Sequence, residues 1–315
     1  MKSRLLALLL PVLLFSACGP GGNPVFTFVD EDGDLVCDAP ADPEQWISPD
    51  RLIFAYTPVE DPAVYQDVWA GFIDHLAEVT GREVVFFPVQ SNAAQLEAMR
   101  AGRLHVTGFN TGSVPIAVNL CGFVPFAMMA AMDGSFGYEM ELIVPAGSEI
   151  EKPEDLEGRE LAFTSPTSNS GHKAPSVILE SKFGLKAGRD FTAVFSGKHD
   201  NSILGIVNGD YEAASVANSV LGRMIERGVV DPAKYRTVFR SQTFPTTAYG
   251  HAYNLEPGLA EKIRSAFFSF SWEGTKLAQE FGKNGEEQFI PITYREHWAV
   301  IREIDEAQGV VYEIR

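Results

Sequence analysis

From residue 51 onward the chain alternates short apolar runs with segments of helical periodicity, and this order restricts the fold more than any other feature. The first array comprises a strand at 51–56, a helix from Tyr65 to Val79, a strand at 83–89, a helix at 93–101 and a strand at 105–109. This β-α-β-α-β order is typical of a parallel sheet, which holds ligands at the carboxyl ends of its strands. We therefore expect Tyr56, Asn110 and Thr111, which end or directly follow strands, to face a common cleft.

A second array of the same kind follows. After a strand at 139–144, predicted strands at 160–163, 193–195 and 211–217 each lead into polar residues. The chain then returns to the first array near 247–253, and the final helices, at 257–281 and 295–308, are expected to pack on the first lobe. The sequence thus predicts an α/β protein of two lobes, each a parallel-rich sheet flanked by helices, with a ligand cleft between them. The predicted boundaries are 51–145 for the first lobe, 146–248 for the second and 249–315 for the return.

The stretch 164–175 in the second array is rich in hydroxyl groups and lies between a strand and a helix. Its candidate ligand-binding residues are Thr167, Ser168, Asn169, Ser170 and Gly171. The backbone N–H groups and the positive end of the dipole at a helix start attract an anion, and the hydroxyl groups add donors. The stretch therefore predicts a site for a small tetrahedral oxyanion. The alternative is that Thr167, Ser168 or Asn169 only caps the helix.

The formal net charge of −17 argues against nucleic acid or an anionic membrane surface as the principal partner. An acidic protein can still bind an anion if several neutral donors converge, because one ordinary hydrogen bond contributes only about 0.5–1.5 kcal/mol. Lys173 carries a positive charge beside the hydroxyl-rich stretch, but we expect its side chain to point to solvent.

The first residues are predicted to be a targeting signal. Lys2 and Arg4 precede an apolar run at 5–15 that is too short to span a bilayer. The run ends in Phe15-Ser16-Ala17-Cys18, which resembles a bacterial lipobox. This resemblance implies a lipoprotein signal peptide at 1–17 and a lipid anchor on Cys18, followed by a tether and extension at 18–50. Ordinary cleavage without lipidation is the alternative.

Cys37 and Cys121 are then the remaining thiols, and two interpretations of them stay open. They form a disulfide, as is common in exported proteins, or Cys121 is a small core residue in an apolar run. The segment 30–38 carries carboxylates at alternate positions, which suits either a Ca²⁺ ion or a solvated acidic turn. Its glycine comes too early for an EF-hand loop, and this favours the acidic turn.

Motifs of the common enzyme classes are missing from the sequence. It contains no G-x-S-x-G, H-E-x-x-H or C-x-x-C pattern, and no G-x-G-x-x-G fingerprint of a dinucleotide site. We therefore expect neither catalysis, nor a cofactor, nor a catalytic metal.

Three stretches resemble one known family, the phosphate, phosphite and phosphonate substrate-binding proteins of bacterial ABC transporters. Residues 166–175 are similar to its P-x-S-T-S-G-x-x-x-P loop, residues 195–202 to its F-x-G-x-H-D segment, and residues 152–158 to the domain-entry phrase of type II periplasmic binding proteins. The resemblance implies a two-lobed extracytoplasmic protein that closes on a small phosphorus oxyanion and delivers it to a permease with its ATPase.

The resemblance also implies roles for individual residues. Ser168 and Ser170 take the places of the hydroxyl groups of the family's loop, and His199 that of its anion-contacting histidine, while Tyr56 and Asn110 close the site from the other lobe. Asn218 stands where a carboxylate would hold an amine, which disfavours an aminoalkyl phosphonate relative to phosphite or phosphate. A bound dianion is expected to favour protonated His199.

Alternatives remain for several of these residues. His199 can instead be a surface residue, Asn218 a helix cap, and Tyr249 a packing residue near the return crossover. An alternative function for the whole protein is to sense a ligand for a membrane kinase, with the thiol of Cys121 binding arsenite. The hydroxyl-rich stretch, however, suits an oxyanion better than a soft arsenic centre.

Overall fold

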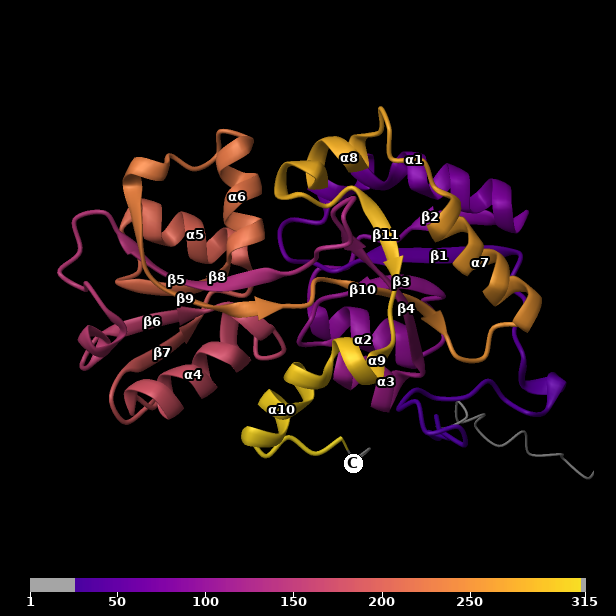
Figure 1. The fold of residues 1–315 in the computed structure, drawn as a ribbon, viewed down its shortest axis with the longest axis horizontal. Helices are drawn as coiled ribbons and strands as arrows, with labels where there is room; N and C mark the ends of the chain where they lie inside the picture. The colour runs from indigo at the N-terminus through magenta and orange to yellow at the C-terminus, as the bar shows by residue number, and fades with distance from the viewer. Residues whose placement is uncertain (1–25, 313–315) are drawn as a thin grey trace, which may run out of the picture.

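The computed structural model describes residues 26–312 and has two lobes joined by two crossing segments (Figure 1). The signal peptide and Cys18 lie outside the described residues. The strands are β1 (Arg51–Tyr56), β2 (Glu83–Phe86), β3 (Val106–Phe109), β4 (Phe123–Ala130), β5 (Tyr138–Pro145), β6 (Glu160–Phe163), β7 (Thr192–Phe195), β8 (Ala213–Ala217), β9 (Tyr235–Phe244), β10 (Ala248–Ala252) and β11 (Gln288–Pro291). The helices are α1 (Ala63–Thr80), α2 (Asn92–Arg100), α3 (Val114–Cys121), α4 (Ala174–Phe183), α5 (His199–Asn208), α6 (Asn218–Glu226), α7 (Pro257–Ser269), α8 (Lys276–Phe281), α9 (Tyr294–His297) and α10 (Ala299–Ala307).

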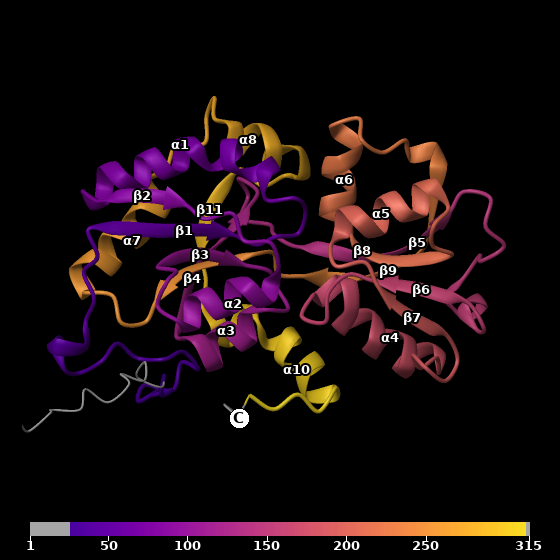
Figure 2. The same cartoon turned by 180° about the vertical axis from the view of Figure 1, so that it is seen from behind.

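Each lobe is built on one mixed sheet. The first sheet has the order β11-β4-β10-β3-β1-β2, in which β2, β1 and β3 run parallel and β10 is antiparallel to β3 and β4. The second has the order β7-β6-β8-β5-β9, in which β7, β6 and β8 run parallel and β5 is antiparallel to both β8 and β9. Helices cover both faces of each sheet (Figure 2). The expected two-lobed α/β architecture is confirmed.

The lobe boundary differs from the expected one. β5, assigned by sequence to the first lobe at 51–145, pairs with β8 and β9 in the second sheet. The chain therefore crosses between the lobes at 131–137, and it crosses back at 245–247 before β10. A single apolar strand cannot reveal its partners, because its neighbours lie some 70 and 100 residues further along the chain.

The C-terminal elements also differ from expectation. The helix expected at 257–281 is two helices, α7 and α8, because the chain becomes extended at Phe270 (φ −68°, ψ 124°) and Gly274 is left-handed (φ +73°) before α8 begins. α10 was expected to pack on the first lobe, and Ile301 and Ile304 do belong to the hydrophobic core of that lobe. α10 also contacts α4 of the second lobe and lies beneath the junction of the two lobes (Figure 1). The described C-terminus thus contributes to the contact between the lobes.

An aromatic core fixes the first strand of the first lobe. Trp69 of α1 packs on Phe54 and Tyr56 of β1, with ring centroids 4.9 and 5.3 Å apart. Burying an aromatic side chain of this size contributes roughly 1.5–3 kcal/mol. Because Tyr56 is the last residue of β1, this packing holds its ring at the carboxyl end of the strand.

The two cysteines are buried and free, so the disulfide interpretation is wrong. The acidic segment forms a compact turn in which one oxygen each of Asp30, Asp32 and Asp34 lie within 4.8 Å of one another. The backbone N–H groups of Leu35 and Val36 donate to Asp30 and Asp34, so these carboxylates order their own turn. Among residues 26–312, no helix combines the length and apolar character needed to cross a membrane.

Candidate functional site

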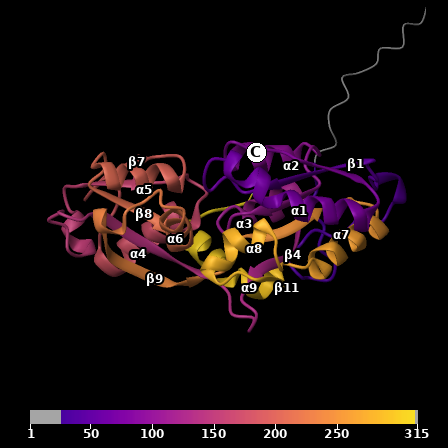
Figure 3. The same ribbon diagram turned by 90° about the horizontal axis from the view of Figure 1, so that it is seen from above.

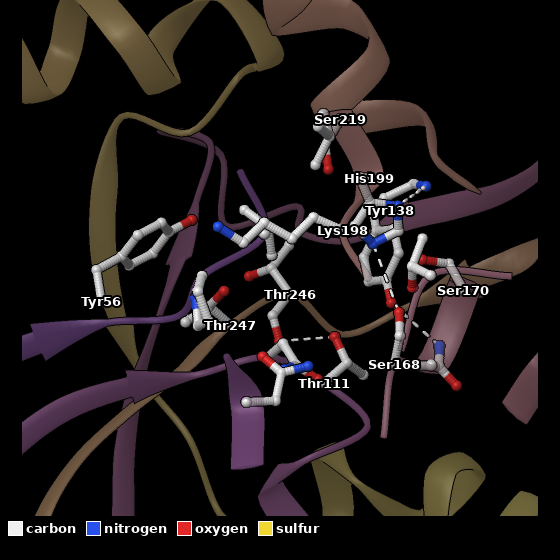
Figure 4. A pocket seen from close by; sticks show the side chains of 18 of the residues that line it. Tyr56, Thr111, Tyr138, Ser168, Ser170, Lys198, His199, Ser219, Thr246 and Thr247 are labelled. Atoms are coloured by element: carbon white, nitrogen blue, oxygen red, sulfur yellow. Dashed lines mark hydrogen bonds between the residues drawn. The ribbon is translucent and has the colours of Figure 1, made fainter. Parts of the chain in front are cut away.

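The two lobes lie side by side (Figure 3). A small cavity of about 60 Å³ lies between them, at the carboxyl ends of the parallel strands (Figure 4). At roughly 10–15 Å³ for one water, this volume holds about four to six water-sized groups. Tyr56, Asn110, Thr111, Tyr249 and Glu286 line it from the first lobe. A compact ligand of four or five heavy atoms fits such a space.

The second lobe contributes the hydroxyl-rich stretch predicted from the sequence. After β6 the chain turns into a π-helical turn, Asn169–Lys173, that runs directly into α4. Ser168 precedes this turn, and its Oγ accepts a hydrogen bond from the N–H of Gly171 at 3.1 Å. Ser168 therefore caps the turn and also lines the cavity, so the capping and ligand-binding interpretations are compatible.

Gly171 shapes this turn without reaching the cavity. A Cβ at this position would stand 1.8 Å from Oγ1 of Thr164, so only glycine allows the turn to pack on the end of β6. Thr167 does not reach the cavity either. Its Oγ1 accepts a hydrogen bond from Nδ2 of Asn92 of the first lobe, at 3.2 Å. These two predicted binding residues thus position the stretch, while Ser168, Asn169 and Ser170 line the cavity.

His199 lies at the start of α5 and is buried. The backbone N–H of Ala217 donates to its Nδ1 at 3.2 Å, so the proton of the neutral ring is on Nε2. Nε2 lies 3.5 Å from Oγ of Ser168 and faces the cavity (Figure 4). Burial, and then the charge of Arg223, lower the pKa of His199 to about 3.

The expectation of a protonated His199 is therefore wrong for this geometry. An imidazolium would need a second N–H on Nδ1, where the Ala217 amide already donates. His199 acts instead as a neutral Nε2–H donor, and the interpretation of His199 as a surface residue is also wrong because only 5% of its surface is exposed.

Asn218 is not a cavity residue. Its Oδ1 accepts a hydrogen bond from the N–H of Glu139 at 3.0 Å, which ties α6 to β5. The next residue, Ser219, lines the cavity in its place, together with Arg223 one turn further along α6. The two residues differ because the first residue of α6 turns toward β5 and the second turns toward the cleft.

Lys173 is also placed differently from expectation. Its side chain is buried, and its Nζ lies 2.7 Å from Oδ1 of Asp305 on α10 and donates to the carbonyl oxygen of Gly112 at 2.8 Å. It is not among the residues that line the cavity. Lys173 thus joins the hydroxyl-rich turn to the first lobe and to the C-terminal helix instead of pointing to solvent.

The cavity contains residues that the sequence did not single out. They include the polar residues Asn92, Tyr138, Lys198, Ser219, Arg223, Thr246, Thr247 and Glu286. Arg223 has no strand-end motif beside it, and its guanidinium Nε stands 3.8 and 3.6 Å from the carboxylates of Glu60 and Glu280. Tyr249, for which packing was the favoured interpretation, is fully buried in the aromatic core and also lines the cavity. No local sequence signal distinguishes such residues, because α6, the return crossover and the segment after α8 come together at the cleft only in the folded chain.

Cys121, proposed as an arsenite-binding thiol, lies at the end of α3 and does not line this cavity. Burial raises the pKa of this thiol to about 12, so it stays protonated near neutral pH. The geometry does not favour the sensing hypothesis.

Residues 54–298 match the family described as "ABC transporter, phosphonate, periplasmic substrate-binding protein". A curated relative, the phosphate-import protein PhnD of Mycolicibacterium smegmatis, is 26% identical over 229 residues, which cover 70% of this chain and 71% of the relative. Two solved structures share the fold, each at 18% identity. A binding protein of an ABC phosphonate transporter from Pseudomonas aeruginosa has a TM-score of 0.75, over 82% of this chain and 87% of that one. PhnD1 from Prochlorococcus marinus, in complex with methylphosphonate, has a TM-score of 0.73, over 84% and 100%.

Proposed function

The chain belongs to the periplasmic substrate-binding proteins of phosphonate ABC transporters, and from this premise we propose that it captures one small phosphorus oxyanion by hydrogen bonds and hinge closure. Phosphite, phosphate and a simple phosphonate are the candidate ligands. As a member of this family it serves an importer with a permease and an ATPase, and the members are transport proteins and not enzymes.

One observation carries the proposal: neutral donors from both lobes converge on a cavity of about 60 Å³. Ser168, Ser170 and the Nε2–H of His199 lie on one side, and the hydroxyl group of Tyr56 lies on the other. Thr111 lines the cavity as well, but its hydroxyl group donates to the carbonyl oxygen of Pro245 at 2.8 Å. Such converging donors suit a small tetrahedral anion, because its negatively charged oxygen atoms point in several directions from the central atom. A ligand that bonds to both sides stabilises the closed arrangement, because it makes all its contacts only when the lobes meet.

Titration calorimetry on the mature chain tests the proposal. We expect phosphate, phosphite or methylphosphonate to bind and to raise the melting temperature, since a ligand that binds only the folded state stabilises it. Small-angle scattering should show a more compact protein with saturating ligand. A dissociation constant of about 1 mM corresponds to a binding free energy of only about −4 kcal/mol. If none of the three ligands bound even at about millimolar concentration, the proposal would be refuted.

We also propose that the chain is exported and anchored through Cys18, on the strength of the lipobox-like sequence. The expected result is labelling of the protein by radioactive palmitate in a bacterial host, and no labelling of the Cys18→Ser variant. Equal labelling of both proteins would contradict this, and an unlabelled, cleaved wild type would support ordinary export.

A further inference from the structure

Glu286, on the segment between α8 and β11, is the one carboxylate among the described residues that line the ligand cavity. It is half-buried, and within residues 26–312 its side chain makes no hydrogen bond or ion pair. Only its backbone N–H is engaged, with the carbonyl oxygen of Phe281 at 3.2 Å. A cavity otherwise suited to an anion therefore contains an unpaired acidic group.

Arg223, a cation of the same cavity, forms no ion pair with this group. Arg223 of α6 stands beside Glu60 and Glu280, and its guanidinium lies 5.2 Å above the ring of Phe281. Burial raises the pKa of Glu286 to about 7, although Arg223 acts in the opposite direction. Near neutral pH this carboxyl group is thus divided between its protonated and ionised forms.

The other charged or titratable groups around it come from several elements of both lobes. They are Tyr56 of β1, Tyr65 of α1, Tyr249 of β10, His199 of α5, Arg223 of α6, and the paired Glu60, Glu280 and Arg227, with Lys198 at the start of α5. Burial raises the pKa of Tyr56 and Tyr249, which line the same cavity, and the charge of Glu286 acts in the same direction. His199 stays neutral.

An ionised carboxylate and a fully ionised oxyanion repel each other in a small cavity that excludes most water. A single proton between them removes the repulsion and forms a charge-assisted O–H···O bond. The proton can come from Glu286 or from an O–H of the ligand. Hydrogenphosphate keeps such an O–H throughout the neutral and alkaline range, whereas sulfate has none and methylphosphonate loses its own in alkaline solution.

We propose that Glu286 selects the protonation state of the ligand: one proton lies between its carboxylate and a ligand oxygen, so the site favours hydrogenphosphate over fully ionised oxyanions. This inference rests on the proposed function, because it names the ligand form that the same cavity prefers. Selectivity here comes from a repulsive group as well as from attractive ones.

Calorimetric titrations of the mature chain with inorganic phosphate, methylphosphonate and sulfate, at about pH 6 and about pH 9, test the inference. For the wild type, phosphate affinity should stay nearly constant through the alkaline range, because hydrogenphosphate brings the required proton itself. Methylphosphonate affinity should fall about tenfold per pH unit in the alkaline range, because one proton must be taken up. Repeating the alkaline titrations in two buffers of different ionisation enthalpy should show uptake of close to one proton with methylphosphonate and none with phosphate.

In the Glu286→Gln variant, the affinity for methylphosphonate should be nearly the same at both pH values, and so should the affinity for sulfate. The preference for phosphate over these two ligands at alkaline pH should therefore fall at least tenfold. Glu287→Gln is the matched control, since this neighbouring carboxylate is exposed and outside the cavity, and it should behave as the wild type. Unchanged selectivity in Glu286→Gln, or a wild type without proton uptake, would overturn the inference. Binding of phosphate by the wild type at about pH 6 tests the proposed function separately.

Discussion

Replacing Gly112 by alanine should prevent full closure of the cleft. Gly112 lies in the first lobe between β3 and α3, and an added Cβ would stand 2.4 Å from the carbonyl oxygen of Thr167 and 2.6 Å from the backbone nitrogen of Asn169. Both atoms belong to the second lobe and to the backbone, so no side chain can turn away. Because heavy atoms settle at about 3.5–4 Å, the lobes would have to separate by about 1 Å.

The cost of this substitution can be estimated from other overpacked contacts. Forcing an extra methyl group into a closely packed region costs about 1–3 kcal/mol. If the cost falls on the closed form alone, ligand affinity should drop about 5- to 150-fold. The open form avoids the contact, so the melting temperature of the ligand-free protein should change little.

Calorimetry with phosphate, and small-angle scattering with and without it, measure these effects. Gly71→Ala is the control, because Gly71 lies on the exposed face of α1 with no atom within 4 Å of an added Cβ. It should bind as the wild type does. If Gly112→Ala also kept wild-type affinity and compaction, the lobes could not meet in the bound state as they do here, and the closure argument would be wrong.

Three further predictions concern other residues of the cleft. Lys173→Met should lower the free energy of unfolding by about 3–5 kcal/mol in urea titrations, because it leaves Asp305 buried without its partner; Lys173→Met combined with Asp305→Leu should recover much of the loss. Ser168→Ala should weaken phosphate binding by about 0.5–1.5 kcal/mol, roughly 2- to 13-fold by calorimetry, and a loss above a hundredfold would indicate a collapsed turn instead of a missing donor. Burial lowers the pKa of His199 to about 3 and of His251 to about 4, while the unfolded chain takes up protons below about pH 6.5. Stability should therefore fall with decreasing pH, by about 2 kcal/mol for each at about pH 5, and His251→Gln should lose less than the wild type.

The periodicity of apolar residues predicted those strands and helices whose bounds depend on nearby residues. β1 and β6 have the expected bounds, 51–56 and 160–163, because each is a short apolar run ended by polar residues. β9 and β11 were missed, since they alternate weakly and are stabilised by partners far along the chain. The placement of β5 in the second lobe depends on the same long-range pairing, which no local pattern records.

The residues of the cavity likewise divide into those that the sequence predicted and those that it did not. Motif-bearing residues such as Ser168, Asn169 and His199 were found because a helix start gathers donors within a few residues. Arg223 and Glu286 were not found, because they come from the interior of a helix and from an irregular segment, and only the assembled fold brings them to the cavity. The state of His199 was predicted wrongly for a related reason: the amide that fixes its tautomer belongs to Ala217, 18 residues away.

The placement of the charges explains how a chain with a net charge of −17 can offer a site to an anion. Near the cleft, Lys173 pairs with Asp305, and Arg227, directly after α6, pairs with Glu60 and Glu280 of the other lobe. These cations connect elements of the two lobes, so their charge stabilises the contact between lobes and is not directed at the ligand. The cavity is lined mainly by neutral donors, together with the cations of Lys198 and Arg223 and one unpaired carboxylate, Glu286. Recognition in such a site depends on where the ligand's oxygens and its proton lie, because a second negative charge alone gains little from uncharged donors and is repelled by Glu286.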